Sequence, residues 1–129
     1  MNAQEMQAFL SARNNAIVGV NRPDAGPQLT PVWYVWDGEA FYFSTTKDRS
    51  KYPNIKRNPS IALIVDDVAS HQYVVAYGRA EIIEQNVAER SRPLIEKYMP
   101  NNVEQGMKMV SDPSRVLVVL RPEKILAHH

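Results

Sequence analysis

Short hydrophobic segments separated by turn-forming residues make up most of this sequence, and their pattern predicts a chain built mainly from β-strands. Each predicted strand is rich in β-branched and aromatic residues, which favour extended backbone. The predicted strands are residues 16–21, 28–36, 40–45, 60–67, 72–84 and 116–120. Asp37-Gly38 follows the second strand, so the second and third strands are expected to form an antiparallel hairpin with a two-residue turn. Gly78 lies inside the long fifth strand and predicts a bend or bulge there.

Four other segments are predicted to be helices. They are residues 3–13, 49–57, 87–99 and 103–110. Asn2 and Glu5 stand at capping-box spacing at the start of the first helix. Asn58-Pro59 is expected to end the second helix and Met99-Pro100 the third, because the residue before a proline disfavours helical backbone.

The order of these elements favours a small antiparallel barrel over a doubly wound parallel sheet. Most strands follow one another in hairpin order, and the helices do not alternate regularly with them. The expected fold class is therefore mainly β with flanking helices (α+β), a six-stranded antiparallel barrel. With 129 residues, the chain is expected to be one domain over residues 1–129. The sequence has neither a GxGxxG nor a GxxxxGK[ST] motif, so a bound phosphate is expected at the rim of the barrel.

Composition excludes several classes of protein. No apolar segment approaches the roughly 20 residues that a membrane helix needs, and residues 1–15 lack the basic start and apolar block of a secretion signal. The absence of cysteine excludes disulfides, thiolate metal sites and a cysteine nucleophile, and it fits a cytoplasmic protein. His128 and His129 end the chain as the remnant of an expression tag would. His71 is expected to be a surface residue of a loop, and no metal site is predicted.

Residues 44–59, which we call the basic segment, carry the most localised chemistry in the sequence. Five cations and one acid give this segment a charge of +4, whereas the remaining residues sum to −3 of the net +1. Its hydroxyls can donate hydrogen bonds, Arg49 can bind a phosphate through two N–H groups, and Lys51 adds a point charge. Free N–H groups at the start of the following helix would point at the same anion. The segment predicts a phosphate-binding site for a small molecule, and the alternative is a solvated helix start.

The order of these motifs resembles the pyridoxamine-phosphate-oxidase-like split β-barrel superfamily. The resemblance rests on the segments PQLTPVWYVWDG, FYFSTT, IALIVDD and YVVAYGRAEII, on the RxK pattern of Arg49 and Lys51, and on the helix stop NIKRNP. It covers roughly residues 5–121. Within the superfamily, the chain is most similar to the branch that includes oxidoreductases dependent on the deazaflavin coenzyme F420.

The resemblance implies a six-stranded split barrel that forms a homodimer, with two flavin-type cofactors in grooves between the subunits. It implies that Arg49 and Lys51 bind the cofactor's phosphate and that residues 28–33 run beneath its ring. Residues near 72–77 of the partner chain would close the groove. The implied cofactor-binding residues are Gln28, Thr30, Pro31, Val32, Trp33, Ser44, Thr45, Thr46, Arg49, Lys51, Gln72 and Tyr77.

The cofactor's tail distinguishes F420 from FMN. FMN ends in a phosphate, whereas F420 continues through a phosphodiester into lactate and several glutamates. Lys47, Lys56 and Arg57 form a surplus of cations that favours F420, with FMN as the alternative. The Arg- and Trp-rich C-terminal extension of true pyridoxamine phosphate oxidases is missing, which argues against vitamin B6 oxidation. A haem-degrading relative would need an axial ligand, for which His71 is the sole internal histidine.

The predicted function is that of an oxidoreductase that uses F420 to transfer a hydride to an organic substrate. An FMN-dependent oxidoreductase and a flavin-binding dimer without turnover are the alternatives. A barrel that binds nucleic acid ranks last, because the cations cluster in one segment. Flavin-type cofactors carry the hydride chemistry themselves, and the sequence contains no recognisable catalytic motif. Tyr34, His71 and Tyr73 are candidates to supply a proton.

Overall fold

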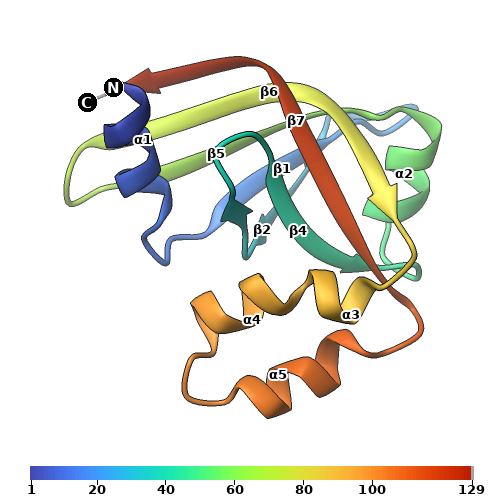
Figure 1. The fold of residues 1–129 in the computed structure, drawn as a ribbon. Helices are drawn as coiled ribbons and strands as arrows, with labels where there is room; N and C mark the ends of the chain where they lie inside the picture. The colour runs from blue at the N-terminus through green and yellow to red at the C-terminus, as the bar shows by residue number, and fades with distance from the viewer. Residues whose placement is uncertain (129) are drawn as a thin grey trace.

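The computed structural model describes residues 1–128 of the chain. Its strands belong to one antiparallel sheet, and its helices lie around that sheet (Figure 1). The strands are β1 (Ala16–Val20), β2 (Gln28–Val32), β3 (Val35–Trp36), β4 (Phe41–Thr46), β5 (Ser60–Asp67), β6 (Gln72–Ile83) and β7 (Arg115–His128). The helices are α1 (Ala3–Leu10), α2 (Lys51–Arg57), α3 (Val87–Arg90), α4 (Arg92–Tyr98) and α5 (Val103–Val110).

The sheet is curled, because strands that are neighbours in sequence form its two opposite edges. The strand order is β2-β1-β5-β6-β7-β4-β3, and only Trp33 and Tyr34 separate β2 from β3. The three residue steps from Val32 to Val35 span at most about 11 Å, so the two edges must come close together. The fold is therefore mainly β with flanking helices, and its curled antiparallel sheet is a half-barrel.

We call the connection through Trp33 and Tyr34 the crossover, because it joins the two opposite edges of the sheet. It corrects the expected single strand over residues 28–36. It also corrects the expected total of six strands, since the described sheet has seven. The backbone leaves the sheet at Tyr34 because side chains of α4 satisfy its polar groups. The N–H of Tyr34 donates to the hydroxyl of Tyr98 at 3.3 Å, and its carbonyl accepts from Nζ of Lys97 at 3.1 Å.

The expected hairpin at Asp37-Gly38 is present as the pair β3 and β4, but its loop is longer than two residues. Val35 pairs with Tyr42, and the backbone N–H of Asp37 donates to the carbonyl of Ala40. The carboxylate of Asp37 accepts hydrogen bonds from the backbone N–H groups of Glu39 and Ala40, each at 2.8 Å. Gly38 adopts a left-handed φ of 97°. The loop therefore spans residues 37–40 and is closed by the Asp37 side chain.

The expected irregularity at Gly78 is confirmed as a register shift between Tyr77 and Gly78 in the pairing of β6 with β7. A Cβ atom at Gly78 would lie 2.5 Å from the carbonyl oxygen of Arg121, so the two backbones approach too closely for another residue. Strand β7 does not end at residue 120 as expected. It continues through Pro122, which pairs with Gly78, because the bulge already interrupts the ladder at the position where proline lacks a donor. His129 lies outside the described residues.

The helices differ from expectation mainly at their ends. The capping box of Asn2 and Glu5 is confirmed, and α1 ends at Leu10. The expected helix over 87–99 is split into α3 and α4 at Ser91, which is buried. Helix α5 has the expected bounds, whereas α2 begins at Lys51, two residues later than expected.

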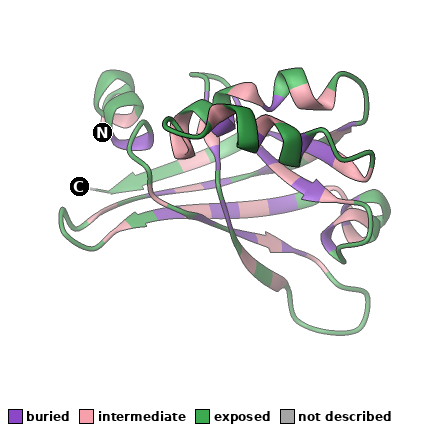
Figure 2. Ribbon diagram, turned by 90° about the horizontal axis from the view of Figure 1, so that it is seen from below, coloured by how far each residue is buried: buried purple, intermediate pink, exposed green. Residues whose placement is uncertain are grey.

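Two hydrophobic cores lie on the two faces of the sheet. The larger core fills the inside of the curl and includes Phe41, Phe43 and Ile55 of α2. The smaller core lies between the sheet and the segment α3–α4, and it includes Leu94 and Leu117. Figure 2 shows the buried segments along the strands, whereas most exposed residues lie on helices and loops. Strand β4 contributes to both cores, because its side chains alternate between the two faces.

Candidate functional site

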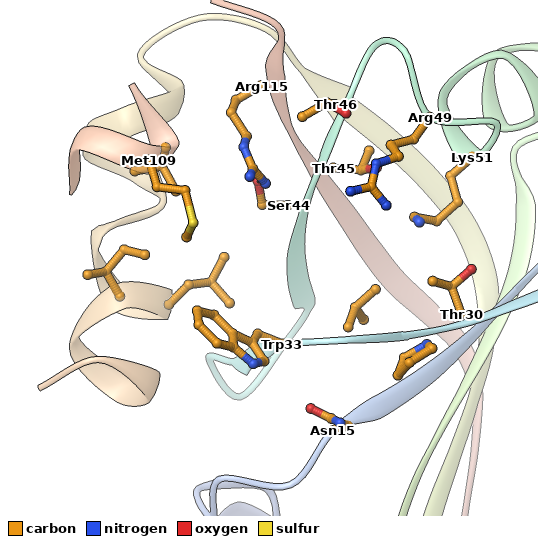
Figure 3. A pocket seen from close by; sticks show the side chains of 15 residues that line it. Asn15, Thr30, Trp33, Ser44, Thr45, Thr46, Arg49, Lys51, Met109 and Arg115 are labelled. Carbon is orange, nitrogen blue, oxygen red and sulfur yellow. The ribbon is translucent and has the colours of Figure 1, made fainter. Parts of the chain in front are cut away.

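A pocket of about 320 Å³ lies where β2, the end of β4, the start of β7 and helices α4 and α5 meet (Figure 3). Its size is in the range of small-molecule sites. Its lining combines cations and hydroxyls with apolar side chains. The lining residues are Asn15, Thr30, Pro31, Val32, Trp33, Ser44, Thr45, Thr46, Arg49, Lys51, Leu94, Ile95, Met109, Val110 and Arg115.

Arg49 and Lys51 form a pair of cations at this pocket, and both side chains point into it (Figure 3). Lys51 is only 4% exposed, and burial together with the charge of Arg49 lowers the pKa of its ammonium group. Within the described residues, neither side chain takes part in an ion pair. A buried ammonium group beside a guanidinium group, without a carboxylate partner, is unfavourable, and an anion bound between them would offset that cost.

Of the three hydroxyl residues at the end of β4, only Thr45 lies on the same face of the sheet as these cations. Thr45 is 4% exposed and lies on the same side of the strand as the larger core. Thr46 donates its hydroxyl to the carboxylate of Asp48, and this hydrogen bond lowers the pKa of Asp48. The arrangement can hold a small anion through charge and through the hydroxyl of Thr45.

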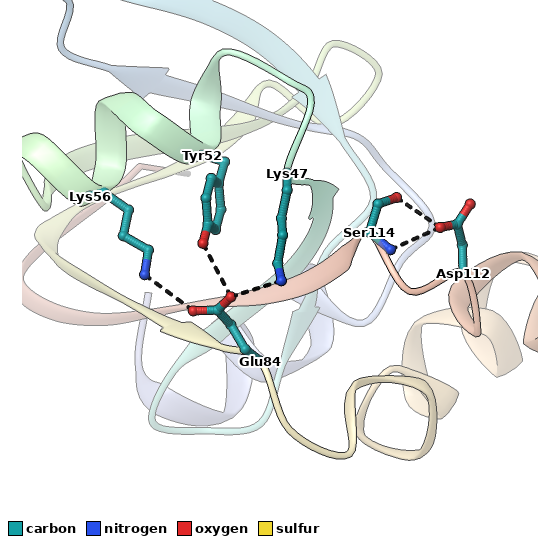
Figure 4. A network of polar contacts seen from close by, with 6 residues as sticks. All are labelled: Lys47, Tyr52, Lys56, Glu84, Asp112 and Ser114. Atoms are coloured by element: carbon teal, nitrogen blue, oxygen red, sulfur yellow. Dashed lines mark hydrogen bonds and ion pairs between the residues drawn. The ribbon is translucent and has the colours of Figure 1, made fainter.

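Two of the three further cations in the basic segment, Lys47 and Lys56, form ion pairs with Glu84, which weakens the argument for F420 from a surplus of cations. Glu84 accepts from Nζ of Lys47 at 3.2 Å, from Nζ of Lys56 at 3.1 Å and from the hydroxyl of Tyr52 at 3.1 Å (Figure 4). Arg57 donates to the backbone carbonyl of Asn21 at 2.6 Å. A long acidic tail would therefore compete with Glu84 for Lys47 and Lys56.

A polar cluster beneath Trp33 fixes the crossover between β2 and β3. The hydroxyl of Tyr98 donates to the carbonyl of Asn14 at 2.6 Å, and Nζ of Lys97 lies 3.8 Å from the ring centre of Tyr34. Burial lowers the pKa of Lys97 to about 8. Trp33 itself is 39% exposed and lines the pocket. The crossover therefore presents an aromatic surface from an anchored backbone.

Most of the residues that the sequence predicted as a cofactor site lie together in this pocket. The nine that line it are Thr30, Pro31, Val32, Trp33, Ser44, Thr45, Thr46, Arg49 and Lys51. Gln28 precedes them on β2 but does not line the pocket, and its Oε1 atom is buried without a hydrogen-bond partner among the described residues. Gln72 and Tyr77, which were predicted to act from a partner chain, lie on β6 away from the pocket of their own chain.

Sequence reasoning missed the pocket residues that come from distant segments. They are Asn15, Leu94, Ile95, Met109, Val110 and Arg115. Helical spacing marked residues 87–99 as a helix with an apolar face, but nothing in the sequence assigned that face to the basic segment.

The three candidate proton donors do not lie at the pocket. Tyr34 is fully buried, and its hydroxyl donates to the carbonyl of Leu10 at 3.0 Å, so it cannot reach a substrate. Burial also raises its pKa. His71 lies in the loop between β5 and β6 and Tyr73 at the start of β6, and neither lines the pocket.

Within residues 1–128, no group of three or more metal-ligating side chains is placed to hold a metal ion. None of the helices in the same residues is long and apolar enough to cross a membrane.

Comparison with known proteins gives one family match and a set of similar structures. The sequence matches the profile of the Pyridoxamine 5'-phosphate oxidase family over residues 3–129. No curated protein matches the sequence. A solved F420 reductase is 28% identical, with 93% of this chain and 94% of that chain covered and a TM-score of 0.75.

Two further structures share the fold at lower identity. A conserved hypothetical protein from Mycobacterium tuberculosis is 23% identical, with 98% of this chain and 84% of that chain covered and a TM-score of 0.86. General stress protein 26 from Bacillus anthracis is 19% identical, with 97% and 92% covered and a TM-score of 0.74.

Proposed function

This chain belongs to the pyridoxamine 5'-phosphate oxidase family, and from this premise we propose that it is a cytoplasmic, homodimeric oxidoreductase that binds a flavin-type cofactor in the pocket. The observation that carries the proposal is the buried Lys51 beside Arg49 without an ion-pair partner among the described residues. These two cations would bind the phosphate of the cofactor, and Thr45 would add a hydroxyl donor.

The remaining predicted residues have related roles in this proposal. Thr30, Pro31, Val32 and Trp33 would hold the ring along β2 and the crossover, and Ser44 and Thr46 would line the entrance beside Thr45. When bound, a flavin or deazaflavin ring supplies the hydride chemistry. The chain's part is to bind the tail, to orient the ring and to leave one face open to the substrate.

F420 is the favoured cofactor and FMN the alternative. The F420 reductase of similar structure, at 28% identity, supports F420. The ion pairs of Lys47 and Lys56 with Glu84 weaken the argument from charge, because these cations are not free for an acidic tail. The preference therefore depends on the relative and not on the charge of the basic segment.

The homodimer is supported by a row of apolar side chains across the outer face of the sheet. Each residue in this row is the register partner of the next, on five adjacent strands. The row is Pro31, Ile17, Ile64, Val75 and Leu126. Ile17 and Leu126 are 37% and 46% exposed, and Leu29 and Tyr77 extend the same face. An exposed apolar patch of this kind marks an interaction surface, and a second copy of the chain would cover it.

This face is continuous with the pocket, because Pro31 belongs to both. A partner seated on it would bring its own β6 toward the pocket entrance. The proposed roles of Gln72 and Tyr77 follow from that placement, as residues of the partner that close the groove. Gln28, on the strand that carries Pro31, would support the ring from its own chain.

Titration of the purified protein with FMN and with F420, followed by quenching of tryptophan fluorescence, tests this proposal. We expect micromolar binding of one cofactor and at least a tenfold loss in the double variant Arg49→Ala, Lys51→Ala. The matched control is Arg90→Ala, Lys108→Ala, which removes the same two residue types from exposed positions outside the pocket. Absence of binding to both cofactors, or equal binding by both double variants, would overturn the assignment.

A flavin-binding dimer without turnover is the second candidate, because none of Tyr34, His71 and Tyr73 lines the pocket of its own chain. Hydride transfer from the reduced cofactor to a panel of quinones, enones and tetrapyrroles separates the two candidates. Turnover of any acceptor supports the enzyme, whereas tight binding without turnover supports the carrier.

A further inference from the structure

Arg115, the first residue of β7, is a third cation of the pocket, and sequence reasoning did not find it. Its Nε atom is buried and has no hydrogen-bond partner among the described residues. Its Nη1 atom lies 3.4 Å from Oγ of Ser44, which is long for a hydrogen bond. A buried guanidinium N–H without an acceptor is costly, so the charge of Arg115 is poorly compensated, and an anion in the pocket that Arg115 lines would offset part of that cost.

The nearby acid does not neutralise Arg115. Asp112 lies close enough for its pKa to be lowered, first by hydrogen bonds from Ser114 and to a lesser extent by the charge of Arg115. Its Oδ1 atom accepts the backbone N–H and the hydroxyl of Ser114 at 2.9 and 2.8 Å (Figure 4). No ion pair between Asp112 and Arg115 exists within the described residues.

Arg115 and the pair of Arg49 and Lys51 approach the pocket from different faces of the sheet. Arg115 is the register partner of Thr46, so these two residues share a face. Leu117, two residues further along β7, packs in the core beneath α3 and α4. In contrast, Lys51 belongs to α2, whose Ile55 packs in the core inside the curl. In Figure 3, Arg115 descends from β7 while the other two cations reach in from the segment of α2.

The residues around Arg115 indicate the chemical class of ligand that it would bind. Leu94, Met109 and Val110 form an apolar wall of the pocket on the side of α4 and α5, and Trp33 faces the same space. Arg115 lines the pocket with a planar guanidinium group whose parallel N–H donors match the two oxygens of a single carboxylate. A phosphate dianion is better balanced by the two charges of Arg49 and Lys51.

We propose that Arg115 binds a carboxylate of the substrate, so that the pocket accepts an apolar, conjugated organic acid beside the cofactor. This inference rests on the proposed function for its link to turnover, whereas the binding of the acid can be measured without turnover. Arg115 then determines which substrates are accepted, and Arg49 and Lys51 bind the cofactor.

The test compares 2-naphthoate with 2-naphthamide, which have the same ring and differ in charge. Binding of both to the full chain is measured by isothermal titration calorimetry, with saturating cofactor where one binds and without it otherwise. We expect naphthoate to bind at least tenfold more tightly than naphthamide. Arg115→Gln should reduce this preference to less than twofold, and Arg115→Lys, which keeps the charge but not the two parallel donors, should retain about threefold.

Two controls separate this inference from the proposed function. Arg90→Gln, at an exposed position outside the pocket, should leave the preference unchanged. The double variant Arg49→Ala, Lys51→Ala should lose cofactor binding but keep the preference for naphthoate. The inference is overturned if wild type shows no preference, if Arg115→Gln keeps it, or if only the double variant loses it. A tenfold loss of cofactor affinity in Arg115→Gln would also overturn it, because Arg115 would then belong to the phosphate site.

Discussion

The indole ring of Trp33 lies flat on the phenol ring of Tyr98, with ring centres 4.9 Å apart and ring planes 3° from parallel. Trp33 belongs to the crossover between the two edges of the sheet, and Tyr98 is the last residue of α4. This stack therefore connects the closure of the curled sheet to the aromatic surface of the pocket. It also explains how a tryptophan that is 39% exposed is held in one orientation.

Two substitutions of Tyr98 separate the stack from the hydrogen bonds of its hydroxyl. Tyr98→Phe keeps the ring but leaves the carbonyl of Asn14 and the N–H of Tyr34 without their partner, so we expect a loss of about 1–3 kcal/mol in the free energy of unfolding. Tyr98→Leu also removes the stack, and a loss of about 3–5 kcal/mol is expected. Urea denaturation measures both losses.

Acrylamide quenching of tryptophan fluorescence reports the orientation of Trp33 in these variants, because Trp36 is only 8% exposed. Quenching should rise in Tyr98→Leu and remain near the wild-type value in Tyr98→Phe. Equal quenching in all three proteins would mean that Tyr98 does not hold Trp33.

The strands were predictable where segments close in sequence pair with each other. The prediction was wrong where a segment distant in sequence determines the backbone conformation. Residues 28–36 read as one strand because hydrophobic and aromatic residues continue through Trp33 and Tyr34. The partner that draws Tyr34 out of the sheet is Tyr98, 64 positions later in the sequence. No local pattern encodes that hydrogen bond, so the change of edge was not predictable.

The same distinction holds for the pocket. Ser44, Thr45 and Lys51 were predictable because one short segment brings hydroxyls and cations together. Leu94 and Arg115 enter the pocket only because α4 packs over the start of β7, which is a property of the tertiary fold. Charge counting also failed for Lys47 and Lys56, since Glu84 approaches them from the end of β6.

Stability should depend on pH through Lys97. Burial lowers the pKa of Lys97 to about 8 from the ordinary value of 10.5, so between these values the unfolded chain binds more protons. The free energy of unfolding should therefore rise with pH across this interval. Because Lys97 is only half-buried, we expect a rise of about 1 kcal/mol.

The measurement for Lys97 is urea denaturation of wild type and Lys97→Met between about pH 8 and 10. The upper limit of pH 10 is set by Tyr34, because burial raises the pKa of its hydroxyl in the folded protein. Above the ordinary tyrosine pKa, the free energy of unfolding therefore falls as pH rises. The free energy of unfolding of wild type, relative to that of Lys97→Met, should rise by about 1 kcal/mol toward pH 10. A constant difference would contradict the lowered pKa.

Gly78 is expected to be required for the pairing of β6 with β7. In Gly78→Ala, the new Cβ would lie 2.5 Å from the backbone oxygen of Arg121 and 3.0 Å from Leu120, and the backbone cannot move aside without breaking the bulge. We expect a loss of about 2–4 kcal/mol in the free energy of unfolding. Gly26→Ala is the matched control, because nothing lies within 4 Å of its Cβ position. Its effect should stay within about 0.5 kcal/mol, and similar losses in both variants would contradict this explanation.

Glu84 offers a way to distinguish the two cofactors by their tails. Its carboxylate holds Lys56 and Lys47, and Lys56 is the main cause of its lowered pKa. Glu84→Gln removes the negative charge and frees both cations. If F420 is the cofactor and its glutamate tail runs along α2, its affinity should increase about three- to tenfold at low salt, because two more cations attract the tail. The affinity for FMN, which ends at its phosphate, should change less than about twofold on the same electrostatic argument.

The control for Glu84 is Glu39→Gln, which removes one exposed acid from the loop between β3 and β4 and should change neither affinity. The gain for F420 should also shrink as salt rises, since the screening length falls from about 10 Å at 0.1 M to about 3 Å at 1 M. Equal gains for both cofactors would mean that Glu84 acts on the phosphate and not on a tail. An unchanged affinity for F420 would mean that the tail leaves the pocket in another direction. The preference for F420 would then gain no support from the cations near α2 and would still rest on the similarity to the F420 reductase.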